Sequence, residues 1–220
     1  MTFPHAHAGV GGHAHDVDVE TTFDFLNTLD LDDGFLVEKL PTLDLALGWF
    51  ADRGLIHLEG ADKARQHAEA HPRSAARDLA RVHQVRGALR EVADATVEHR
   101  TPRQDAIAEV NRALHARQVI ELTAEIDGCS VDHRHVGDPV DDALARLSEA
   151  LVQELVSGEP DRIRICDNET CRWVFYDTSR TARRRWCDMA TCGNRAKQAR
   201  HRAKAKAKSG EPGSTAILGL

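Results

Sequence analysis

Residues 166–192 read CDNETCRWVFYDTSRTARRRWCDMATC, and this stretch decides how the C-terminal part of the chain folds. Four residues separate Cys166 from Cys171, fifteen lead on to Cys187, and four more separate it from Cys192. Each pair can supply one edge of a tetrahedron from a tight turn, which is the arrangement that a structural Zn²⁺ requires. We therefore expect the four thiolates to bind one zinc ion. Two disulfides, or four thiols buried as small apolar groups, are the alternatives.

The residues around the cysteines favour a small metal-bound module. Nearby arginines would keep the sulfurs deprotonated; they are Arg172, Arg180, Arg183, Arg184, Arg185 and Arg195. The aromatic and β-branched run Trp173–Tyr176 suits one arm of a hairpin. After Gly193 an Ala/Lys/Arg stretch has strong helix propensity. A turn, a hairpin, a second turn and a helix together predict a treble-clef-like finger.

This region resembles a known family. The run from Arg164 to His201 is similar to the CGNR zinc finger of bacterial proteins, named for residues that stand here as Cys192, Gly193, Asn194 and Arg195. The family is regarded as a set of DNA-binding transcription regulators that are often linked to stress responses. The resemblance implies that role for this chain.

Charge is unevenly distributed along the 220 residues. Residues 163–208 carry thirteen Lys/Arg against four Asp/Glu, whereas residues 1–162 carry sixteen against thirty, within a net charge of −6. A concentrated basic end suits a polyanion, and an acidic body repels one. We therefore expect nucleic-acid contact only in the C-terminal module.

The N-terminus lacks the basic start and apolar segment of a secretory signal, and no apolar run is long enough to span a membrane. We expect a cytoplasmic, nucleoid-associated protein without a membrane partner, in a compartment where disulfides are disfavoured. The fifth cysteine, Cys129, has no spaced partner and is expected to be a small core residue.

The expected organisation has four parts. Residues 1–18 form a His-rich flexible tail, in which loose metal binding is the alternative. Residues 19–160 form a helical domain that ends at Gly158-Glu159-Pro160, residues 161–208 form the finger, and residues 209–220 form a second flexible tail. The fold class is α+β, mainly α.

Capping residues and apolar periodicity predict the helices of the body. The first begins near Thr21, which would cap it together with Asp24, and uses Phe25, Leu26 and Leu29 as its apolar face. The other expected helices cover five ranges: from Thr42 or Asp44 to Gly54, residues 61–70, residues 74–99, from Pro102 to Leu114, and from Asp138 to Gly158. Alternation from Ile120 to His135 predicts a hairpin with its turn at Asp127-Gly128. His133 and His135 have no third ligand and are interpreted as half-exposed strand residues.

Arg86 falls in the middle of the apolar face made by Leu79, Val82, Leu89 and others, so an anion should meet it. A structural ion pair with a core Asp or Glu is one interpretation, and a clamp for the carboxylate or phosphate of a small effector is the other.

The body has a resemblance of its own. FDFLNTL, LALGWFADRGL and ALRE are similar to segments of the ABATE domain, which commonly precedes CGNR fingers and is thought to sense a small molecule. The resemblance implies a pocket that contains Asp24, Asn27, Thr28 and Arg86. Core hydrogen bonding is the alternative for Asp24 and Asn27.

The basic residues of the finger are candidates for DNA contact. Zinc would hold the helix after Gly193 rigidly, with alanines from Ala196 to Ala207 packed against the module. The candidates are Arg183, Arg184, Arg185, Arg195, Lys197, Arg200 and Arg202. Arg183–Arg185 can also neutralise the zinc thiolates, and Lys204–Lys208 can equally be a solvated helix end.

We predict a zinc-dependent regulator of duplex DNA whose body senses an anion or dimerises. An RNA- or protein-binding zinc module is the alternative. No nucleophile–base pair, phosphate loop or open metal site is evident, so we expect no enzyme.

Overall fold

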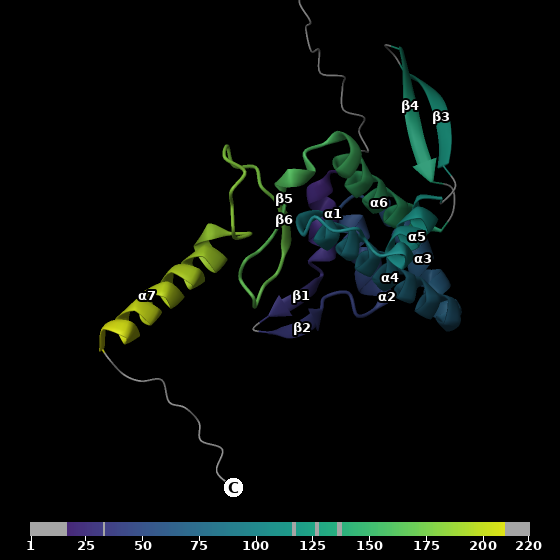
Figure 1. Cartoon of the computed structure of the whole chain (residues 1–220). Coiled ribbons are helices and arrows are strands. Elements are labelled where there is room, and N and C mark those ends of the chain that lie inside the picture. Colours follow the sequence, from purple (N-terminus) through teal and green to yellow (C-terminus); the bar gives the residue numbers. More distant parts are fainter. Residues whose placement is uncertain (1–16, 33, 116–117, 126–127, 136–137, 210–220) are drawn as a thin grey trace, which may run out of the picture.

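The longest helix, α4 (Pro72–Val97), passes through the body, and α1, α2, α3, α5 and α6 pack on it (Figure 1). The computed structural model describes residues 17–32, 34–115, 118–125, 128–135 and 138–209. These residues form a mainly helical domain followed by a cysteine-rich finger that ends in a helix. The predicted α+β, mainly α fold class is confirmed.

Side-chain caps set the starts of three helices, α1, α2 and α6. The helices around α4 are α1 (Val19–Leu26), α2 (Leu43–Asp52), α3 (Leu58–Ala70), α5 (Gln104–Leu114) and α6 (Pro139–Ser157). As predicted, Thr42 caps α2 and Asp138 caps α6, whose first residue is a proline. The predicted helix near Thr21 is present as α1, but the predicted cap was wrong, because Asp18 is the cap and accepts a hydrogen bond from the Thr21 amide at 2.7 Å.

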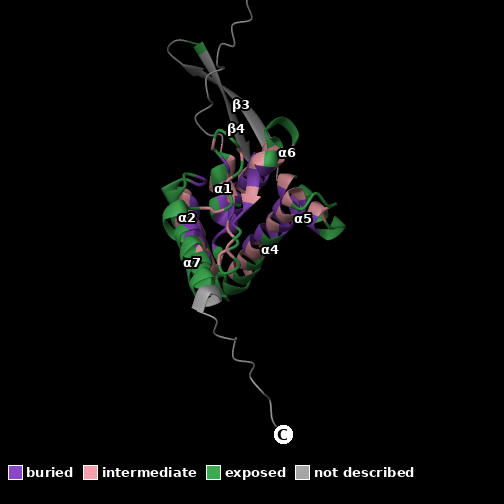
Figure 2. Ribbon diagram, turned by 60° about the vertical axis from the view of Figure 1, so that its left-hand side comes forward, coloured by how far each residue is buried: buried purple, intermediate pink, exposed green. Residues whose placement is uncertain are grey.

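Apolar side chains from these helices form one core (Figure 2). Phe25 lies 5.7 Å from Trp49 and 6.0 Å from Phe50 between ring centroids, so α1 and α2 meet through aromatic contacts. Leu144, Leu147 and Leu151 bring α6 onto the same core. Leu29, which the sequence assigned to the face of the first helix, lies instead in a strand and is 40% exposed.

The described residues contain three two-stranded antiparallel sheets. The first pairs β1 (Leu29–Asp32) with β2 (Phe35–Glu38) and was not predicted. The second pairs β3 (Gln118–Glu125) with β4 (Gly128–His135), which confirms the predicted pairing of the two strands. Of the predicted turn, Gly128 is the first residue of β4, and Asp127 lies outside the described residues. The side chains of Cys129, His133 and His135 lie outside the description.

The third sheet joins the two halves of the chain. A short 3₁₀ turn (Pro160–Arg162) leads into β5 (Ile163–Ile165), which pairs with β6 (Val174–Tyr176). Ile163, Ile165 and Val174 are buried in the same core as the helices. The first cysteine pair therefore lies in the turn of a hairpin whose strands are anchored in the helical body.

The finger ends in α7 (Asn194–Ser209), which follows a π-helical turn (Met189–Gly193) and projects away from the body (Figure 1). Ala196 is half-buried, but Ala199 and Ala203 are exposed, so the expected packing of the alanine face holds only for the first turn. Most of the helix is solvated. The two predicted tails, up to residue 16 and from 210, lie outside the described residues.

Among the described residues, no helix combines the length and the apolar character that crossing a membrane requires.

Candidate metal centre and nucleic-acid interface

The first cysteine pair sits in a tight turn between β5 and β6. Cys166 directly follows β5, and its amide donates to the Trp173 carbonyl at 2.8 Å. The Asn168 carbonyl accepts from the amides of Cys171 and Arg172 at 2.9 and 3.1 Å. Arg172 has a φ of 57°, which turns the chain back into β6. These bonds aim both sulfurs to the same side of the turn.

The second pair is formed by the π-helical turn. The Asp188 carboxylate accepts from the Thr191 amide at 2.7 Å, and the Asp188 carbonyl accepts from the Gly193 amide at 3.0 Å. This closed turn brings Cys192 back toward Cys187. The Asp167 amide donates to the Arg185 carbonyl at 2.8 Å, which holds the second pair against the first.

The four sulfurs converge on one point. All lie within 4.8 Å of one another, with 3.7 Å between the Sγ atoms of Cys171 and Cys187 and 3.8 Å between those of Cys187 and Cys192. A metal–sulfur distance of about 2.3 Å gives a tetrahedron with edges of about 3.8 Å. A disulfide requires about 2.05 Å. The spacing therefore fits a tetrahedral metal site and excludes the two-disulfide alternative.

Contacts among the cysteines shift their pKa values in opposite directions. Hydrogen bonding from the Cys187 thiol, together with amides including that of Asn168, lowers the pKa of Cys166 to about 5. Donation to Cys166 raises the pKa of Cys187, while burial and the nearby Cys166 charge raise that of Cys171 to about 12. The protein alone thus favours the charged form of Cys166 and opposes that of Cys171 and Cys187, and a bound cation would favour deprotonation of these two thiols.

A buried carboxylate shapes the loop between β6 and the second pair. Asp177 is fully buried and accepts from the amides of Ser179 at 2.9 Å and Arg184 at 2.7 Å. Burial opposes its ionisation, but these hydrogen bonds prevail and lower its pKa. Arg162 and Arg164 donate to carbonyls of the same loop at 2.7–3.0 Å. The sequence analysis missed Asp177, although Asp-Thr-Ser is a turn-forming triplet.

The candidate DNA-contacting arginines of this loop differ in their surroundings. Arg183 is exposed. Arg184 donates to the Cys187 carbonyl at 2.6 Å, and its guanidinium lies 5.0 Å from the Phe175 ring centroid. Arg185 pairs with Asp167 at 2.5 Å. Arg184 therefore supports the turn that carries Cys187, while Arg183 faces solvent.

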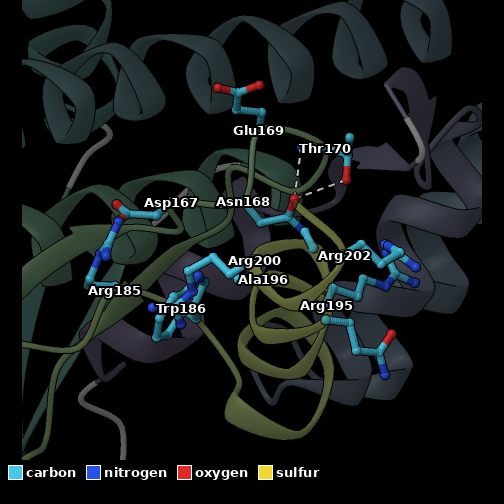
Figure 3. A pocket seen from close by; sticks show the side chains of 12 residues that line it. Asp167, Asn168, Glu169, Thr170, Arg185, Trp186, Arg195, Ala196, Arg200 and Arg202 are labelled. Atoms are coloured by element: carbon cyan, nitrogen blue, oxygen red, sulfur yellow. Dashed lines mark hydrogen bonds and ion pairs between the residues drawn. The ribbon is translucent and has the colours of Figure 1, made fainter. Parts of the chain in front are cut away.

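The remaining candidates, Arg195, Lys197, Arg200 and Arg202, lie on α7 and are exposed. Three of them line a groove between α7 and the first cysteine loop (Figure 3). The groove is lined by Asp167, Asn168, Glu169, Thr170, Arg185, Trp186, Arg195, Ala196, Gln198, Ala199, Arg200 and Arg202. Lys197 is not among the lining residues.

Trp186 and Asn168 were not recognised from the sequence. The Trp186 ring centroid lies 5.2 Å from the Arg185 guanidinium and 5.8 Å from that of Arg200. The Asn168 side chain donates to the Cys192 sulfur at 3.4 Å, and its oxygen accepts from Thr170. An aromatic residue that follows three arginines and directly precedes Cys187 was the available signal for Trp186.

The candidate effector residues are only partly brought together. Arg86 is buried and donates to the Thr28 hydroxyl at 2.8 Å and to both Glu38 oxygens, in one case at 2.8 Å. Burial opposes ionisation of Glu38, but the Arg86 hydrogen bonds and the Leu40 amide lower its pKa. The anion that the sequence required at Arg86 is thus Glu38.

The other two candidates lie elsewhere. Asp24 forms a largely exposed ion pair with Arg53. The Asn27 side chain bonds to the backbone of Val174 in β6. Neither residue contacts Arg86 through an observed hydrogen bond.

A mainly helical domain is thus joined to a four-cysteine finger, which could hold a metal ion, and to a basic terminal helix. Residues 20–159 match the family model ABATE, described as "Putative stress-induced transcription regulator", and residues 162–205 match the CGNR zinc finger. The chain belongs to the ABATE family and carries the CGNR finger, as the sequence resemblance indicated. No curated protein matches the chain. The matched families are of regulator and zinc-finger types, not enzyme families.

Proposed function

We propose that this protein is a zinc-dependent transcription regulator that contacts duplex DNA through its C-terminal finger, acting at the nucleoid in the cytoplasm. The four cysteines are the zinc ligands in this proposal, and the basic residues of the finger meet phosphates. The helical domain senses a small anion or dimerises. The family description and the convergent sulfurs support it.

The observation that carries the proposal is the contrast between paired and unpaired cations. Arginines of the body with a carboxylate partner are Arg53, Arg65, Arg81, Arg86, Arg90, Arg100, Arg103 and Arg112. Exposed arginines of the body without one, among the described residues, are Arg73 and Arg77. Exposed cations of the finger without one, among the described residues, are Arg172, Arg180, Arg183, Arg195, Lys197, Arg200, Arg202 and Lys204. Arg162 and Arg185 of the finger do have a carboxylate partner. Uncompensated cations on one module provide the charge that phosphates neutralise.

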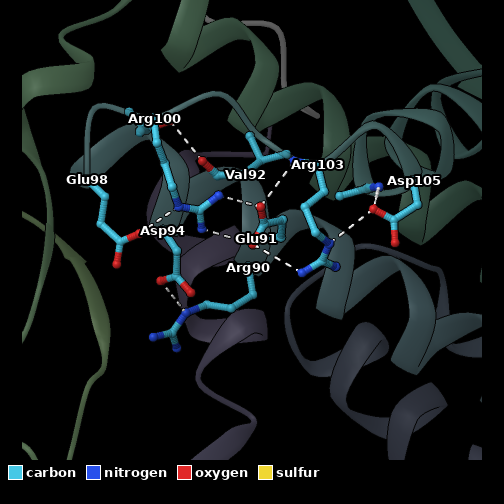
Figure 4. Close-up of polar contacts among 10 residues, drawn as sticks. Arg90, Glu91, Val92, Asp94, Glu98, Arg100, Arg103 and Asp105 are labelled. Carbon is cyan, nitrogen blue, oxygen red and sulfur yellow. Dashed lines mark hydrogen bonds and ion pairs between the residues drawn. The ribbon is translucent and has the colours of Figure 1, made fainter.

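Glu91 is an example of a body carboxylate that pairs with neighbouring arginines (Figure 4). Its carboxylate accepts from Arg100 at 2.6 and 3.0 Å, from the Arg103 amide at 3.1 Å and from the Arg103 guanidinium at 3.4 Å. Arg100 also bonds to Glu98, and Arg103 to Asp105. These arginines are committed to the fold, which leaves Arg73 and Arg77 as the exposed body arginines without an ion pair among the described residues.

Zinc has a structural role in this proposal. Four cysteine ligands complete a tetrahedral shell and leave no position for an activated water. A bound zinc ion supplies on the order of 10 kcal/mol of coupled folding free energy to small modules. The cysteine turns and the start of α7 carry few buried apolar side chains, so the metal is what fixes their geometry.

The effector part of the proposal centres on Arg86 and Thr28, with Asp24 and Asn27 as the weaker candidates because they are engaged elsewhere. The Arg86 side chain is 4% exposed and that of Glu38 is 27% exposed, so Glu38 is the replaceable partner. A small carboxylate or phosphate would take its place on the guanidinium. Such a ligand would release β2 from α4.

Metal analysis and filter binding on the intact chain test the function. We expect one zinc per chain, binding to duplex DNA that weakens steeply with salt, and loss of both binding and α7 structure on chelation. Hydrogen exchange should show α4 still protected after chelation. Binding with a shallow salt slope and no preference for a duplex would favour the RNA- or protein-binding module instead.

A further inference from the structure

The groove between α7 and the first cysteine loop has three sides, and each is attached to a different part of the metal site. One wall, Asp167–Thr170, lies between Cys166 and Cys171. Trp186 directly precedes Cys187, and the α7 wall begins at Arg195, three residues after Cys192. Because the four sulfurs fix all three sides, the groove has a defined shape only when they are gathered together.

The α7 wall is cationic along one side of the helix. Arg195 and Arg202 are seven residues apart, about two turns or ~10.5 Å along the axis, and both line the groove. Gln198 and Ala199 lie between them and also line the groove, so no acidic side chain separates the two arginines on the helix. Neither arginine has a carboxylate partner among the described residues. Lys197 and Lys204 lie about half a turn away, at roughly 100° per residue, on the other side of the helix.

The opposite wall does not cancel this charge. Arg185 neutralises Asp167, which leaves Glu169 at the rim as the one lining carboxylate without a described ion pair. The Arg200 guanidinium lies near the Trp186 ring, as the Arg185 guanidinium does (Figure 3). The groove therefore presents several cations and an aromatic surface to an extended anion.

We propose that one sugar–phosphate strand of duplex DNA lies in this groove, with Arg195 and Arg202 on its phosphates and Trp186 against its sugars. The inference rests on the proposed function and deepens it. α7 spans sixteen residues, about 24 Å, and the major groove is about 12 Å wide and admits a helix. A helix in the major groove has a backbone strand along each flank. The flank of α7 that faces the first cysteine loop is this groove.

Two double variants with equal charge changes on the same helix test the assignment. Arg195→Gln with Arg202→Gln removes two cations from the groove side, and Lys197→Gln with Lys204→Gln removes two from the other side. We expect the groove-side pair to weaken duplex binding on the order of 100-fold and to reduce the log–log salt slope by about 2. The control pair should lose on the order of 10-fold or less. Zinc content and circular dichroism should be unchanged in both, since all four residues are exposed.

Tryptophan fluorescence gives an independent readout. We expect duplex DNA to change the emission of the intact protein and to have a much smaller effect on Trp186→Phe, which retains Trp49 and Trp173. Equal losses from the two double variants, or an unchanged response in Trp186→Phe, would overturn the groove assignment while leaving DNA binding intact. Equal affinity and an equal response with a single strand would overturn the duplex geometry. Absence of any DNA binding by the intact zinc-loaded chain would instead refute the proposed function.

Discussion

Asn27, at the end of α1, bonds to Val174 of β6 through both backbone groups of that residue. Its amide nitrogen donates to the Val174 carbonyl at 2.9 Å, and its oxygen accepts from the Val174 amide at 3.0 Å. Both residues are buried and lie 147 positions apart in the chain. One side chain thus takes the place of a neighbouring strand and fixes the finger hairpin to the first helix.

Replacing Asn27 by Ala should destabilise the protein by about 3 kcal/mol, because a buried N–H and a buried C=O are left without partners. Urea unfolding would measure the loss. Asp24→Ala, one turn earlier on the same helix, is the matched control and should cost less than about 1 kcal/mol, since its pair with Arg53 is largely exposed. Similar losses in the two variants would argue against the role of Asn27.

The two partners of the Arg86–Glu38 pair should respond unequally to substitution. Glu38→Gln leaves a guanidinium that is 4% exposed without its counter-charge and should cost about 3 kcal/mol. Arg86→Met leaves a carboxylate that is 27% exposed and still bonded to the Leu40 amide, so it should cost less. Chemical denaturation of both variants tests the order, and a larger loss in Arg86→Met would contradict it.

Glu91 should contribute to acid sensitivity. Hydrogen bonds from Arg100, followed by the Arg103 amide, lower its pKa from 4.5 to about 2 in the folded state. Since the folded pKa lies below the unfolded one, its stabilisation is complete above pH 4.5 and is lost as the pH falls toward 2.

Thermal melts of the wild type and Glu91→Gln between pH 2 and 6 would measure this contribution. The difference in Tm between the wild type and Glu91→Gln should be largest above pH 4.5 and should decrease toward zero as the pH approaches 2. Acid also protonates the cysteines, but it does so in both proteins, so the difference isolates Glu91. A constant difference across the range would be inconsistent with this assignment.

Neighbouring arginines should separate structural from DNA-contacting roles. Arg184→Gln removes the bond to the Cys187 carbonyl and the contact with Phe175, and should lower both Tm and zinc affinity. Arg183→Gln changes an exposed cation and should weaken duplex binding several-fold with an unchanged Tm. Competition with a metal chelator and filter binding distinguish the two outcomes. If Arg183→Gln released zinc as readily as Arg184→Gln, the division would not hold.

Local signals explain which features the sequence predicted. Thr42 and Asp138 cap their helices through neighbouring amides, and the regular apolar spacing of α4 and α6 places their core faces. The four cysteines also follow from spacing alone, because the requirements of a tetrahedral ion are local to two turns.

Long-range pairing explains what the sequence did not predict. Nothing near Arg86 indicates that its partner is Glu38, and nothing near Asn27 indicates Val174. The β1–β2 hairpin was missed although Leu29–Asp32 alternates and an Asp-Gly pair follows, because Phe35, Leu36 and Val37 form a continuous apolar run. The Trp186 groove depends on three segments that only the folded finger brings together.

The hairpin of β5 and β6 has a consequence for how such chains are inherited. The two family matches meet between residues 159 and 162, directly before β5, yet Ile163, Ile165 and Val174 complete the core of the preceding helices. A recombination event at that junction would leave a cavity in the core of the upstream helices. It would also expose the apolar side chains of the β5–β6 hairpin to solvent in the downstream segment. Gene shuffling that moved this finger to a new host protein would therefore need to supply other helices against which the β5–β6 hairpin can pack.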